Sequence, residues 1–124
     1  MVDDAIPDDV RDFILGHIDS VAELEALLLL RANNREPWDV PRTAARLYAS
    51  QDQIKDVLTH LSADGLLVKE NERFRYETSG EQADIIDRLA EVYRRNLIPV
   101  TNVIHTKPSR VREFADAFKF RKDS

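Results

Sequence analysis

The sequence has no cysteine, no long apolar run and no basic leader, and each absence excludes a class of protein. Without cysteine, the chain has no disulfide scaffold, no thiolate metal site and no cysteine nucleophile. Its longest apolar run, residues 26–30, is much shorter than the roughly 18–20 residues of a membrane-spanning helix. The acidic start, residues 1–9, does not resemble a signal peptide. We therefore expect a cytoplasmic protein that has no membrane partner.

Recognisable catalytic motifs are missing as well. The chain has no glycine-rich phosphate loop, no G-x-S-x-G elbow and no H-E-x-x-H zinc motif. His17, His60 and His105 lie far apart in the sequence, where a structural or surface role fits them better than metal binding. Neighbouring acids such as Asp8 and Asp9 suit the first turn of a helix better than acid–base chemistry. The sequence predicts a protein that is not an enzyme and that uses no cofactor and no metal.

The chain that remains has the size and composition of one folded domain, but its charge is unevenly distributed. It has 124 residues, of which 43% are apolar, and a formal net charge of −5. Residues 1–36 hold nine acids and three bases, whereas residues 107–124 hold three acids and six bases. This asymmetry favours self-association or contact with a polar partner, including an acidic or protein partner.

Helical spacing of apolar residues is found in four segments: residues 6–18, 20–34, 41–47 and 50–64. Two of them begin with a capping box, in which a serine precedes a Glu or Gln by three residues. After Gly65 the pattern alternates, with Leu66 and Val68 before a polar turn and Phe74 and Tyr76 after it. We predict a two-stranded hairpin here, and it must pack on the helices because a lone hairpin is marginally stable.

Residues 81–106 form the longest segment with helical spacing. Pro99 should kink this helix or split it, and we favour a kink because the apolar pattern continues past the proline. The heptad seam of this segment consists of Ile86, Ala90, Tyr93, Leu97, Val100 and Ile104. The seam either packs within one subunit or forms an interface between two. Because a second apolar stripe runs alongside it, we predict a homodimer.

The basic C-terminal segment carries three phenylalanines among its charged residues. Ser109 is positioned to cap a last short helix with Phe114 and Phe118 on one face. Three interpretations are open: a clamp across the dimer, a docking patch for an acidic partner, or an arm on the DNA backbone. We favour the clamp, which places Phe114 and Phe118 in a dimer interface that extends over residues 81–118.

The span from Trp38 to Glu77 resembles the winged helix-turn-helix superfamily, especially bacterial regulators of the MarR and ArsR type. PRTAARL takes the place of the positioning helix, residues 48–50 the turn, QDQIKDVLTHLSADG the recognition helix and LLVKENERFRYE the wing. The resemblance implies a mainly α (α+β) fold. It places a winged-helix domain with a two-stranded wing at residues 1–79. A dimerisation helix and a short terminal helix at residues 80–124 complete the same compact unit.

The same resemblance implies a DNA-binding regulator of transcription that acts as a dimer. The residues expected to contact DNA are Arg42, Arg46, Ser50, Gln51, Lys55, Thr59, Arg73 and Arg75. Asp52 and Asp56 share the outer face of the recognition helix, however, and would repel phosphate. The alternative is therefore a winged-helix adaptor that binds proteins and not DNA.

Overall fold

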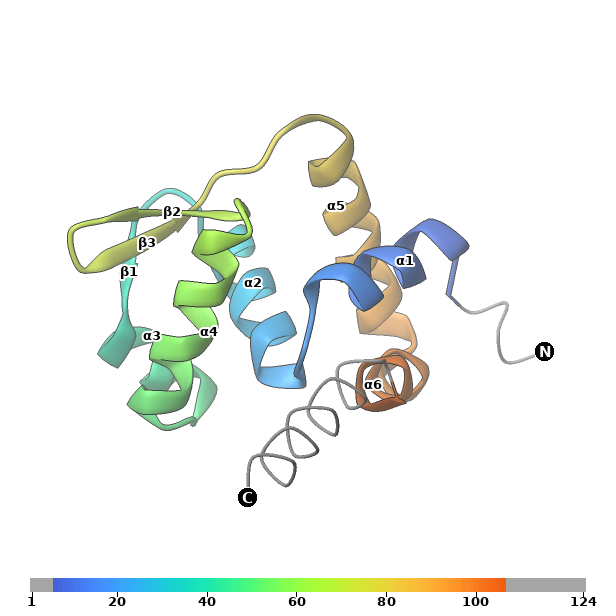
Figure 1. The fold of residues 1–124 in the computed structure, drawn as a ribbon, viewed down its shortest axis with the longest axis horizontal. Coiled ribbons are helices and arrows are strands. Elements are labelled where there is room, and N and C mark those ends of the chain that lie inside the picture. The colour runs from blue at the N-terminus through green and yellow to red at the C-terminus, as the bar shows by residue number, and fades with distance from the viewer. Residues whose placement is uncertain (1–5, 107–124) are drawn as a thin grey trace, which may run out of the picture.

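The computed structural model describes residues 6–106, which fold into helices and one small antiparallel sheet (Figure 1). The helices are α1 (Asp8–His17), α2 (Val21–Ala32), α3 (Val40–Leu47), α4 (Gln51–Ala63), α5 (Gly80–Arg95) and α6 (Leu97–Thr106). The strands are β1 (Trp38–Asp39), β2 (Leu67–Glu70) and β3 (Arg73–Tyr76), in the order β1-β3-β2. The expected mainly helical α+β class is confirmed.

Helix α2 lies at the centre of the molecule, between two groups of elements (Figure 1). The sheet, α3 and α4 lie at one end, and α1, α5 and α6 pack together at the other. The core is made of apolar stripes from these helices, and its fully buried members include Ile14, Leu24, Leu27, Leu30, Ile54, Leu58, Leu61, Ile86 and Leu89. Burial of these stripes is the main force that holds the two groups on α2.

Side-chain caps fix where three of the helices begin. The Ser20 hydroxyl accepts a hydrogen bond from the Glu23 N–H at 3.1 Å, and Ser50 does the same for the Gln53 N–H at 3.1 Å. Both capping boxes are thus confirmed at their serine side. Asp39 caps α3 in the same way, through the Arg42 N–H at 2.8 Å.

The sheet has one strand more than the sequence predicted. Gly65 ends α4 with a left-handed φ of +85°, and the hairpin β2–β3 follows as expected. In addition, Trp38 pairs with Phe74 and Asp39 with Arg73, so β1 forms a third strand on the far side of β3. The buried Trp38 side chain, 2% exposed, holds this backbone against the sheet. The prediction of a two-stranded sheet was therefore wrong by one short strand.

Residues 81–106 form two helices and not the favoured kinked helix, and the break lies at Asn96 instead of Pro99. Asn96 leaves the helical conformation, with φ −136° and ψ 57°, and α6 begins at the next residue. Pro99 is then the third residue of α6, in the first turn, where a missing N–H costs nothing. A continuous helix would have pushed the proline ring against the Arg95 carbonyl, four residues earlier.

The two segments at the ends of the described chain share one core. Helix α1 packs against both α5 and α6, and Val100 and Ile104 of α6 are buried. Helices α5 and α6, the described part of residues 80–124, therefore pack in the same core as α1. Within residues 6–106, no helix is both long enough and apolar enough to cross a lipid bilayer.

Candidate nucleic-acid interface

The outer face of α4 carries three of the predicted DNA contacts. Gln51, Lys55 and Thr59 are spaced four residues apart and are all exposed, so they form one row along the helix. The opposite side of α4 is buried in the core, which fixes the direction in which this row points. The structure thus brings these three side chains together on one rigid, solvent-facing surface.

Ser50 has a structural task at the start of α4. Its hydroxyl oxygen already accepts the Gln53 N–H bond that caps the helix. Its side chain therefore has a role inside the fold, because it satisfies a backbone N–H at the start of the helix. Its backbone and side chain mark the N-terminal end of the exposed row.

The predicted arginines divide into two groups. The Arg42 guanidinium lies 3.8 Å from the centre of the Trp38 ring and 2.9 Å from Glu36, and Arg75 contacts Glu77 at 2.9 Å. These partners neutralise much of the charge that a phosphate would meet, and the Glu77 bond raises the pKa of Arg75. A phosphate would therefore compete with the protein's own acids for these two arginines.

Arg46 and Arg73 are the arginines that remain available. Both are exposed, and neither forms a salt bridge with another residue in the described part of the chain. Arg46 lies near the end of α3, and Arg73 begins β3 beside the hairpin turn. Together with Lys55 they are the cations best placed to meet a phosphate.

Acidic residues interrupt this basic surface. Asp52 and Asp56 are exposed on α4, and Glu70 and Glu72 flank the hairpin turn at Asn71. Each of them would repel phosphate, so the surface that carries Lys55 and the arginines is of mixed charge.

Tyr48, in the turn between α3 and α4, is a surface feature that the sequence reasoning assigned to the turn without a function. Its side chain is 97% exposed, more than that of any other large apolar residue described. Its backbone is left-handed, with φ 57° and ψ 43°. The available sequence signal was a large aromatic residue two positions before a helix cap, which is weak because turns tolerate many residues.

A buried carboxylate joins α2 to α4 on another side of the molecule. The Glu23 side chain is 3% exposed, accepts the Asp19 N–H at 2.7 Å and contacts Nδ1 of His60. Burial raises the pKa of Glu23, and the bond to Glu23 raises the pKa of His60. Asp19, Glu23 and His60 offer ligand atoms within 4.8 Å of one another, an arrangement that can also hold a metal ion. The sequence missed this group because Glu23 and His60 are 37 residues apart.

The predicted dimer seam is only partly at the surface. Ile86, Val100 and Ile104 are buried in the core of the single chain, so they have no area to offer a second copy. Their burial contradicts their assignment to an interface, and packing within the subunit explains their heptad spacing. Phe114 and Phe118 lie outside the described residues.

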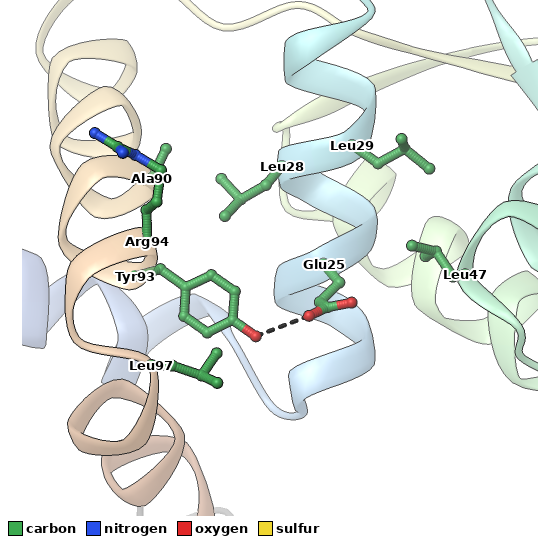
Figure 2. Close-up of a pocket in the computed structure, with 8 residues that line it drawn as sticks. All are labelled: Glu25, Leu28, Leu29, Leu47, Ala90, Tyr93, Arg94 and Leu97. Atoms are coloured by element: carbon green, nitrogen blue, oxygen red, sulfur yellow. Dashed lines mark hydrogen bonds between the residues drawn. The ribbon is translucent and has the colours of Figure 1, made fainter.

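The remaining seam residues line an apolar groove between α2 and α5 (Figure 2). Its lining consists of Glu25, Leu28, Leu29, Leu47, Ala90, Tyr93, Arg94 and Leu97. The Tyr93 ring points from α5 toward α2, where its hydroxyl donates a hydrogen bond to Glu25 at 2.8 Å. Burial of the Tyr93 hydroxyl is the largest cause that raises its pKa. Leu97, at the lower end of the groove, is 54% exposed, and the adjacent Ile98 is 68% exposed.

No family model, no curated protein and no solved structure matches the chain.

Proposed function

We propose that this protein is a DNA-binding regulator of transcription with a winged helix-turn-helix architecture, and that it acts as a homodimer. The observation that carries the proposal is the row of polar side chains on α4, presented between α3 and the β2–β3 hairpin. The succession of α3, a short turn, α4 and the β2–β3 hairpin along the chain supports this proposal.

In this proposal α4 enters the major groove, which is wide enough to admit a helix. Gln51 and Thr59 donate and accept hydrogen bonds at base edges, and Lys55 meets a phosphate. Arg46 and Arg73 provide further phosphate contacts at the two sides of α4. Arg42 and Arg75 contribute less, because Glu36 and Glu77 already neutralise them.

A second copy of the chain compensates for the low DNA affinity of a single α4 helix. Asp52 and Asp56 reduce phosphate attraction, so one copy of α4 gives low affinity. Two copies bound to one duplex double the contacts and place two α4 helices on successive turns of the groove. The exposed apolar residues Leu97 and Ile98, with the groove beside them, supply a surface for the second copy.

A titration of fluorescently labelled duplex DNA across a salt series tests the proposal. Affinity should fall steeply as salt rises, because bound phosphates release counterions. Lys55→Glu should weaken binding roughly tenfold or more and reduce the salt slope by about one to two ions. Arg95→Glu is the matched control, since Arg95 is an exposed arginine on α5 away from α4.

Two results would contradict DNA binding through the outer face of α4. One is affinity that does not change with salt, and the other is an equal loss for Lys55→Glu and Arg95→Glu. In the second case the effect would come from total charge alone and not from the α4 surface.

A protein–protein adaptor is the second candidate, favoured by the acids on the same face. Asp52 and Asp56 alternate with Gln51 and Lys55 on α4, a mixture of charges common on surfaces that bind proteins. An adaptor would show no salt-dependent affinity for DNA, so the same titration separates the two candidates.

A further inference from the structure

The turn between α3 and α4 holds a tyrosine in a position that usually needs glycine. Tyr48 follows the last residue of α3 with φ 57° and ψ 43°, and the Ala49 N–H donates to the Ala44 carbonyl at 3.0 Å. The Tyr48 N–H donates to the Ala45 carbonyl at 3.4 Å. This pair of bonds is the Schellman ending of a helix, whose left-handed residue is most often glycine because a Cβ is disfavoured there.

The rest of the described chain follows the rule that Tyr48 breaks. The other residues with positive φ in that part are Gly65, Gly80 and Asn71, all of which tolerate the left-handed region. Tyr48 is the exception, and its bulk makes the conformation costly.

Within residues 6–106, no side-chain contact of Tyr48 offsets this cost. The Tyr48 side chain is 97% exposed, and it makes no ring contact or hydrogen bond with another described residue. A glycine would therefore close the same turn with less strain. A strained backbone that carries a side chain into solvent indicates a function at the surface.

We propose that Tyr48 contacts the sugar–phosphate backbone of DNA bound by α4, a role that rests on the proposed function. Tyr48 lies two residues after Arg46 and two before Ser50, at the N-terminal end of the exposed row on α4. Its hydroxyl donates a hydrogen bond to a phosphate oxygen, and its ring covers the adjacent sugar. Such contacts position the protein on the duplex without reading the base sequence.

The test compares Tyr48→Gly and Tyr48→Phe with the unmodified full chain in two measurements. In thermal unfolding, Tyr48→Gly should raise Tm by about 2–5 °C, because it removes left-handed strain. Asn71→Gly is the matched control and should raise Tm less, since asparagine already tolerates this conformation.

In the DNA titration, Tyr48→Gly should be unfavourable, although the same substitution raises Tm. Tyr48→Gly should bind duplex DNA about three- to tenfold more weakly, and Tyr48→Phe should lose the part of that affinity due to the hydroxyl. The loss should be equal for different base sequences. The salt slope should not change, because tyrosine carries no charge and releases no counterion.

Three results would overturn the inference. Equal DNA affinity for Tyr48→Gly and the unmodified chain would mean that Tyr48 does not contact DNA, and the proposed function would still hold. A lower Tm for Tyr48→Gly would show that the side chain supports the fold. No DNA affinity in the unmodified chain would overturn the proposed function itself, and this inference with it.

Discussion

At the scale of single residues, the contact between Glu23 and His60 joins a buried carboxylate to an imidazole at the surface. It joins the first turn of α2 to the last turn of α4, the helix proposed to read DNA. A buried carboxylate without a partner costs folding free energy, so His60 both satisfies Glu23 and fixes α4 in place. Asp19 and Asp64 also face His60 and favour its charged form.

This contact makes stability depend on pH. The bond to Glu23 raises the pKa of His60 in the folded state, so folding is favoured by the protonated imidazole. That contribution is complete below the ordinary histidine pKa of about 6.5 and is lost as pH rises through the raised folded value. We predict that His60→Gln lowers the free energy of unfolding most near pH 6 and progressively less toward pH 9.

Urea unfolding of both chains at a series of pH values measures this difference. His105→Gln is the control, because His105 is an exposed histidine that forms no salt bridge with a described residue. If the loss caused by His60→Gln is the same at every pH, the imidazole and the carboxylate do not form a charged pair.

At the scale of elements, the N-terminal cap of α4 stabilises the first turn of the helix that carries the exposed row Gln51, Lys55 and Thr59. Replacement of Ser50 by alanine leaves the Gln53 N–H without its side-chain acceptor. We predict that Ser50→Ala lowers the free energy of unfolding by about 1 kcal/mol. Thermal or urea unfolding checks it.

The control for this change lies in the same helix. Ser62 is near the end of α4, where alanine is a better helix former than serine. Ser62→Ala should therefore be neutral or slightly stabilising. Equal losses for the two variants would mean that the cap contributes nothing beyond general helix propensity.

The elements that depend on local signals could be predicted from the sequence, and those that depend on distant partners could not. Serines three residues before Glu or Gln gave the starts of α2 and α4, and Gly65 gave the end of α4. Strand β1 exists only because β3, more than thirty residues later, pairs with Trp38. The break at Asn96 was hidden because apolar spacing continues across it from Tyr93 to Val100.

The same distinction holds for the candidate site. The row Gln51, Lys55 and Thr59 follows from helical spacing alone, and its exposure was expected. Neutralisation of Arg42 by Glu36 and of Arg75 by Glu77 depends on side-chain conformations that spacing does not define. The unusual position of Tyr48 is defined by its left-handed backbone angle φ, which residue spacing does not predict.

At the scale of the whole molecule, the groove between α2 and α5 has the features of an association surface. We predict that the unmodified chain has about twice its monomer mass of 14.3 kDa in solution at micromolar concentration. Leu97→Asp should return it to the monomer mass, since it places a charge on the exposed apolar rim. Sedimentation equilibrium measures both.

Leu15→Asp is the control for that experiment. Leu15 is also an exposed leucine, 37% accessible, but it lies on α1 and does not line the groove. It should leave the dimer intact. A monomer mass for the unmodified chain would contradict the proposed dimer. Equal dissociation by both variants would mean that the interface is not at the groove.

The other proposals depend on contact between DNA and the outer face of α4 with the β2–β3 hairpin. The most direct measurement is an NMR titration of the isotopically labelled full chain with a short DNA duplex. We expect amide shifts in the first two turns of α4 and around Arg73, with little change in α1 and in the part of α5 that does not line the groove. Shifts confined to α1, α5 or α6, or none at saturating DNA, would contradict this contact.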